Sequence, residues 1–215
     1  MIAENAKSGI GKIYKAQIVT IIATIITIAG AIAMVAFGKI VSSDGNAVNI
    51  ADVVSLVAIL VSLVLALIAF FMNVKGISLA SKDEPSFKDA MVMLIMGLIT
   101  SVLAVVFSKT KPSLSKSFES INNIAELFTT YYIIRGCINL AEQRKKDDIV
   151  KAGKTATNII IIVWLIATLL QSAAVFFPSQ DKTAIETILS IAALVLAIVS
   201  YVIYLRVLNK TSDIL

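Results

Sequence analysis

The sequence predicts an all-α membrane protein, a six-transmembrane-helix bundle arranged as three tandem αα hairpins with the N- and C-termini in the cytoplasm. Composition is the first reason for this prediction. Hydrophobic residues make up 58% of the 215 residues and charged residues 15%, whereas soluble domains carry roughly 25% charged residues. Long charge-free stretches and a one-sided distribution of lysine and arginine are the second and third reasons.

Charge-free stretches locate five of the spans. A helix needs about 20 mostly apolar residues to cross a hydrocarbon core about 30 Å thick. The stretches that meet or approach this length are residues 16–38, 53–74, 90–107, 155–180 and 187–205. We therefore expect one integral membrane domain over residues 1–215, with spans at about 16–38, 52–75, 90–108, 117–140, 156–178 and 185–206.

The span at 117–140 does not follow from hydropathy, because it contains Glu119 and Glu126. The positive-inside rule favours it. With six spans, the side that holds both termini carries 14 of the 19 basic residues and the other side 5, whereas with five spans the N-terminal side carries 7 and the other 12. Short loops rich in Lys and Arg stay in the cytoplasm, so the six-span arrangement obeys the rule. The alternative is an amphipathic helix lying on the membrane surface.

A weak internal repeat favours the same number of spans. The segments "FFMNVKGISLA" (70–80) and "YYIIRGCINLA" (131–141) align with a shift of 61 residues, and the last span ends in the similar "YVIYLRVLNK" (201–210). Duplication of a helical hairpin explains this pattern. Independent placement of aromatic and basic residues at the cytoplasmic interface explains it as well, so both interpretations stay open.

One polar stripe marks the candidate site. At about 100° per residue, several polar residues of the fourth span fall on one helical face. They are Glu119, Asn122, Asn123, Glu126 and Thr130. Because a charged side chain facing lipid costs at least ~2.5 kcal/mol on insertion scales, we expect the stripe to face other helices or a water-filled cavity. Gln171 of the fifth span is a further candidate for the same site.

Residue types that are missing exclude several classes of enzyme. The chain has no histidine and a single cysteine, Cys137, so H-E-x-x-H metalloprotease sites and Ser-His dyads are impossible. The sequence contains no Walker A motif and no G-x-S-x-G motif. We expect no catalytic residue, no metal site and no cofactor. The formal charge of +5 is expected to meet lipid phosphates rather than nucleic acid, because the basic residues flank apolar segments.

Two functions fit these features. The first is a small-solute permease of a cell inner membrane, or the membrane-embedded substrate-binding subunit of a transporter. In it, Glu126 and its polar neighbours contact a small polar solute or a cation. The alternative is a structural or accessory membrane protein that docks a partner membrane subunit, with the stripe as its assembly surface. In either case the lipid bilayer is the main partner.

The topology can be tested by cysteine accessibility. Single cysteines at Ser113 and Ser212, in a background lacking Cys137, are expected to react with a membrane-impermeant maleimide from opposite sides of the membrane. Labelling of both from the same side would support the surface helix instead.

Overall fold

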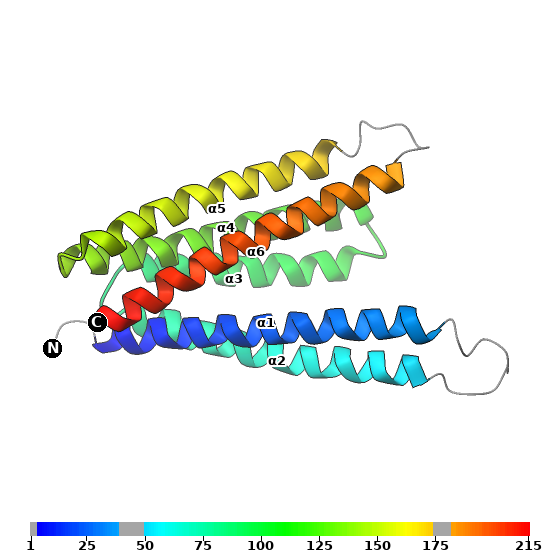
Figure 1. Cartoon of the computed structure of the whole chain (residues 1–215), viewed down its shortest axis with the longest axis horizontal. Coiled ribbons are helices and arrows are strands. Elements are labelled where there is room, and N and C mark those ends of the chain that lie inside the picture. Colours follow the sequence, from blue (N-terminus) through cyan, green and yellow to red (C-terminus); the bar gives the residue numbers. More distant parts are fainter. Residues whose placement is uncertain (1–3, 39–49, 174–181) are drawn as a thin grey trace. The chain divides into compact units, whose positions relative to one another are not determined.

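The computed structural model describes residues 4–38, 50–173 and 182–215, and the helix ends next to the gaps are described as backbone only. These residues form six helices and no strand (Figure 1). The helices are α1 (Glu4–Gly38), α2 (Ile50–Ala80), α3 (Ser86–Phe107), α4 (Pro112–Gln143), α5 (Asp147–Ala173) and α6 (Lys182–Ile214). All except α4 are long and apolar enough to cross a membrane. The five apolar helices indicate a multi-pass membrane protein, as the sequence predicts.

The helices extend beyond the predicted spans into polar segments. α1 begins at Glu4 and runs for 35 residues, although its charge-free part begins only at Ala16. Backbone hydrogen bonds continue a helix outside the hydrocarbon layer as readily as inside it, and hydropathy detects only the apolar part. The structure therefore confirms the five long apolar helices, and these helices are longer than the charge-free stretches by which the sequence identifies them.

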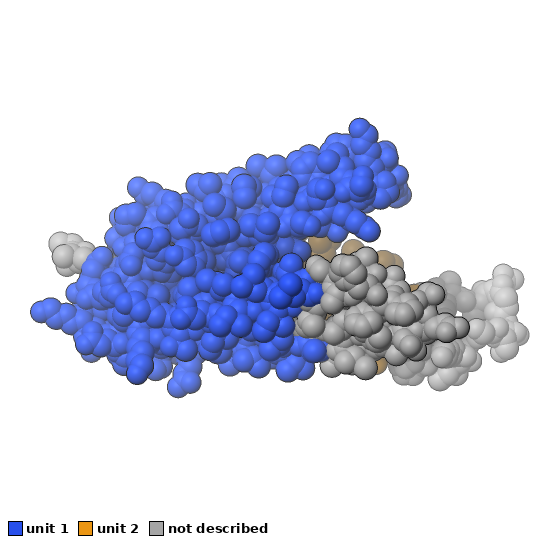
Figure 2. All heavy atoms as spheres, turned by 90° about the horizontal axis from the view of Figure 1, so that it is seen from above, with its two compact units in different colours: residues 1–10, 77–215 blue, residues 11–76 orange. Residues whose placement is uncertain are grey.

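Two compact units make up the chain, and each is described by itself (Figure 2). Unit 2, residues 11–76, contains most of α1 and α2. Within it, the Gln17 Nε2 atom donates a hydrogen bond to Asn73 Oδ1 at 3.3 Å. The Ser62 hydroxyl lies 3.1 Å from the Ala23 carbonyl oxygen of the facing helix and also bonds its own helix. Small and polar side chains therefore join α1 to α2, as is common between helices in lipid.

Unit 1, residues 1–10 and 77–215, is organised around α4, which contacts α3, α5 and α6. The contact with α3 is the most extensive. On α3, Gly97 faces Asn122 and Ala125 of α4. Nearer the other end of the pair, the buried ring of Phe87 lies directly over Gly136. Small residues at these positions let the two backbones approach closely.

Two adjacent acids in the loop between α2 and α3 cap different helices. Asp83 accepts a 2.7 Å hydrogen bond from the Ala6 backbone N–H, in the first turn of α1. Glu84 is 5% exposed, and at the start of α3 its Oε1 atom accepts from the Ser86 backbone N–H at 3.3 Å and from the Ser86 hydroxyl at 2.9 Å. Carboxylates at helix N-termini satisfy free N–H groups and complement the helix dipole. The loop thus fixes where both helices begin.

The contact at Gly136 predicts a specific sensitivity. A Cβ atom there would lie 2.5 to 2.9 Å from three carbon atoms of the Phe87 ring, so Gly136→Ala should destabilise the protein by about 1–3 kcal/mol through overpacking. Gly97→Ala is the matched control, because its Cβ atom would meet neighbours at 3.2 Å or more. In thermal unfolding in detergent, Gly136→Ala should have a lower melting temperature than Gly97→Ala. Adding Phe87→Leu to Gly136→Ala should restore the stability. Equal stability of both alanine variants would contradict the contact.

Candidate functional site

One seam of α4 changes character halfway along the helix. Residues spaced alternately by three and four positions lie along one face of an α-helix, as in a coiled-coil heptad. On α4 this seam consists of Lys116, Glu119, Asn123, Glu126, Thr130, Ile133, Cys137 and Leu140. Its N-terminal half is polar and its C-terminal half is mostly apolar. Most of the predicted polar stripe therefore continues directly into an apolar contact surface.

The apolar half of the seam lies in the part of α4 that packs against α5 and α6. Ile133, Cys137 and Leu140 are all buried, and the Cys137 side chain is hydrogen-bonded to Thr211 of α6. At this end of unit 1, α4 is also held by α5, because Gly153 of α5 lies against Ile138. Burial of these side chains gives the junction of the three helices its main stabilisation.

The polar half of the seam is uncovered. Lys116, Glu119, Asn123 and Glu126 are exposed, and Thr130 is half-buried. The neighbouring helices have no buried side chain at the corresponding level, neither over residues 157–169 of α5 nor over residues 195–203 of α6. The packing of α5 and α6 onto α4 is thus concentrated near the C-terminal end of α4 (Figure 1). The seam is polar where this packing leaves it open.

Hydrogen bonds within α4 organise part of the open stripe. The Asn122 amide donates from Nδ2 to Glu126 Oε1 at 2.9 Å, and a Cβ atom added to Gly97 on α3 would lie 3.2 Å from Asn122 Oδ1. The Ser115 hydroxyl bonds the Ala104 carbonyl of α3 at 2.8 Å and lies 3.5 Å from Glu119 Oε1. Asn122 therefore orients Glu126, and α3 in turn holds Asn122 in place.

The predicted site residues have different positions in the structure. Asn122 is half-buried and lies against Gly97 of α3. Glu119, Asn123 and Glu126 are exposed, and Thr130 lies at the edge of the buried region. Gln171 belongs to the end of α5 that is described as backbone only, so its predicted contribution lies outside the described side chains.

The opposite face of α4 is suited to lipid. Ile121, Ile124 and Phe128 are exposed there. The Phe128 ring lies 6.4 Å from the Tyr131 ring and 6.2 Å from the Tyr132 ring, centroid to centroid. An aliphatic surface that ends in clustered aromatic rings is typical of a helix that passes from hydrocarbon into the interface. α4 thus has a lipid-type face, a face for α3 and a polar seam.

The carboxylates of the exposed polar stripe, Glu119 and Glu126, are not paired with any basic side chain that the structure describes. An ion pair joins Lys154 Nζ to Glu142 Oε1 at 3.3 Å, beyond the buried half of α4. Among the side chains that the structure describes, Glu126 accepts a hydrogen bond only from the Asn122 amide, through its Oε1 atom. Within the described part of the chain, no group of three or more acidic or cysteine residues could hold a metal ion. The stripe can therefore offer one or two carboxylates together with amide and hydroxyl groups.

The chain matches no protein-family profile, no curated protein and no solved structure. Its function has to be argued from this geometry alone.

Sequence reasoning did not find the buried Glu84 cluster. The Asn139 amide of α4 donates to Glu84 Oε1 at 2.8 Å and lies 3.2 Å from the Ser86 hydroxyl oxygen. The only local signal was an acid just before a helix start, in Glu84-Pro85-Ser86. Its partner on α4 is 55 residues away, and no sequence pattern connects the two. Because the Ser86 donors bond Glu84 within the loop and the Asn139 amide joins α4 to the same group, we assign the cluster a structural role.

Proposed function

We propose that the protein passes or captures a small polar solute or a cation at the open polar half of the α4 seam. In this proposal α4 is the fourth of six spans in a cell inner membrane, both termini are cytoplasmic, and the chain is not an enzyme. The protein acts as a small permease or as the membrane-embedded substrate-binding subunit of a transporter. The helices then form three tandem hairpins, and the 14 to 5 split of basic residues supports this orientation.

The observation that carries the proposal is the exposed Glu126 beside exposed Asn123. At membrane depth, a carboxylate that faces lipid without a partner is unfavourable by at least ~2.5 kcal/mol on insertion scales. A bound cation, a proton or water in a polar passage removes most of that cost. Since no basic side chain is bonded to Glu126 in the described part of the chain, a positively charged or hydrogen-bonding solute is the occupant that best fits the site.

Replacing Glu126 by Gln tests this function while keeping the shape of the side chain. In proteoliposomes, fluxes of Na⁺, K⁺ and methylammonium should fall at least about tenfold, because a hydrogen bond to a charged group contributes roughly 1.5–3 kcal/mol. Glu142→Gln is the matched control, since Glu142 is an exposed acid of α4 outside the seam. Unchanged flux in a folded Glu126→Gln protein would remove the proposed role.

A second candidate function is supported by the same exposure. Asn123 and Glu126 are exposed, and exposed amide and carboxyl groups join helices in lipid. The protein would then be an accessory subunit that docks a partner membrane chain through the stripe. Here Asn122, Asn123 and Glu126 changed together to leucine should abolish co-purification of that partner from membranes. Retention of the partner by the triple variant would exclude the stripe as the docking surface.

A further inference from the structure

The turn between α4 and α5 contains an unusual backbone conformation. Lys145 has φ 54°, and it is the one non-glycine residue with positive φ in the part of the chain that the structure describes. The Lys145 N–H bonds the Glu142 carbonyl at 3.0 Å, and the Lys146 N–H bonds the Ala141 carbonyl at 2.9 Å. These bonds close the end of α4 in the way that a glycine in the left-handed region usually does.

A lysine is an unfavourable choice at such a position. Its Cβ atom crowds the backbone when φ is positive, whereas glycine has no Cβ and asparagine tolerates the conformation. Residues held in a disfavoured conformation point to a requirement for the side chain itself. For Lys145, that side chain is exposed, so the requirement concerns what it presents to the surroundings.

The turn is held firmly on both sides. Ala141, Ile149 and Val150 are buried together, with Ile138 and Ile214 packed against them. Across the turn, Glu142 pairs with Lys154. The backbone on either side of Lys145 is therefore fixed by packing, and with it the direction in which the Lys145 side chain leaves the backbone.

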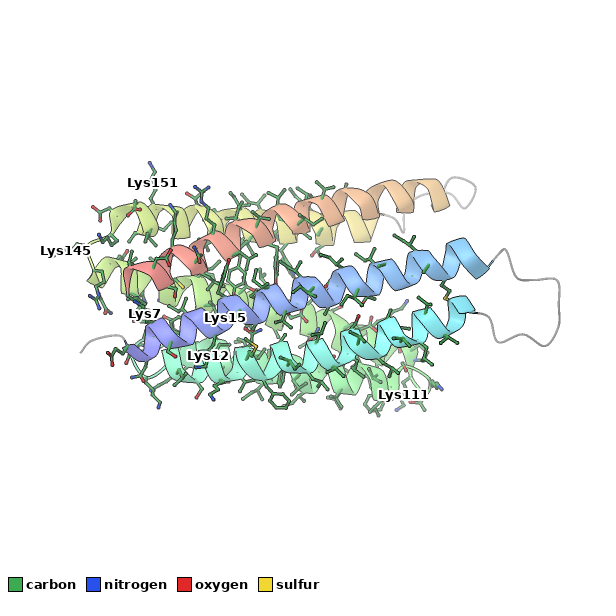
Figure 3. The ribbon with its side chains drawn as sticks, turned by 60° about the horizontal axis from the view of Figure 1, so that its bottom comes forward. Lys7, Lys12, Lys15, Lys111, Lys145 and Lys151 are labelled. Carbon is green, nitrogen blue, oxygen red and sulfur yellow. The ribbon has the colours of Figure 1, made fainter. Side chains whose placement is uncertain are left out.

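The charge on this turn is predominantly positive. Lys145, Lys146 and Lys151 are exposed, and Figure 3 shows Lys145 and Lys151 projecting outward at the end of unit 1 where Lys7 also lies. Of the nearby acids, Glu142 pairs with Lys154, and Asp147 and Asp148 lie in the first turn of α5. There the helix dipole stabilises carboxylates and reduces their effect on the surroundings.

We propose that this turn binds the headgroups of anionic phospholipids, with Lys145 as its principal contact. α5 is apolar enough to cross a membrane and begins at Asp147, so the turn lies at the surface of a bilayer. Lysines at that depth attract anionic lipids within a Debye length. A soluble acidic protein would have to approach through the same headgroup layer, which makes lipid the better occupant.

Lys145→Asn tests the proposal because asparagine keeps the left-handed turn and removes the charge. The purified full-length protein in a neutral detergent is titrated with phosphatidylglycerol or phosphatidylcholine, and bound lipid is followed by native mass spectrometry and thermal unfolding. We expect about fivefold weaker binding of phosphatidylglycerol, since one lysine near an anionic surface contributes about that factor. Lys145→Arg should retain the affinity. Lys145→Gly should weaken binding while leaving the melting temperature unchanged or raised.

Lys111→Asn is the matched control. Lys111 is an exposed lysine at the N-cap of α4 and therefore lies at the opposite end of that helix (Figure 3); its replacement should leave the affinity unchanged. Three results would overturn the proposal. They are equal affinity of Lys145→Asn and wild type, equal binding of the two lipids, and equal stabilisation of the protein by inorganic phosphate or by soluble polyglutamate.

Discussion

Close approach of α3 and α4 is the contact on which the rest of unit 1 depends. α4 is too polar to qualify as a span by hydropathy, so its own apolar surface holds it in a membrane less firmly than its neighbours are held. Gly97 and Gly136 mark the places where the two helices approach closely enough to compensate through packing. With that contact in place, α4 has a separate face left for polar residues and another for lipid.

The seam of α4 shows how one helix serves two purposes. Its C-terminal half contributes Cys137 and Leu140 to the junction with α5 and α6, and its N-terminal half carries Asn123 and Glu126 beyond that junction. If α4 were apolar throughout, α5 and α6 would pack against it along its whole length. The change near Thr130 instead limits how far the three helices pack, and this opening is what makes a solute or a partner helix chemically acceptable there.

Much of this could be predicted from sequence. Absence of charge over a bilayer's thickness was enough to identify the five apolar helices, and periodicity placed Glu119 and Glu126 on one face of α4. Periodicity does not say which neighbour a face meets, so it could not decide whether another helix covers Asn123 and Glu126 or leaves them exposed. Likewise Lys145 lies in a run of basic residues without the glycine or asparagine that signals a left-handed turn, and the Glu84 cluster depends on a tertiary contact with Asn139.

The cap that Asp83 places on α1 also bears on the order of folding during synthesis. The first turn of α1 leaves the ribosome early, but the carboxylate that bonds the Ala6 N–H follows 77 residues later. Until both apolar helices between them have been made, the start of α1 has to satisfy its free N–H groups with water. The first turn of α1 therefore reaches its final conformation only after α2 has been inserted, although it is translated before α2.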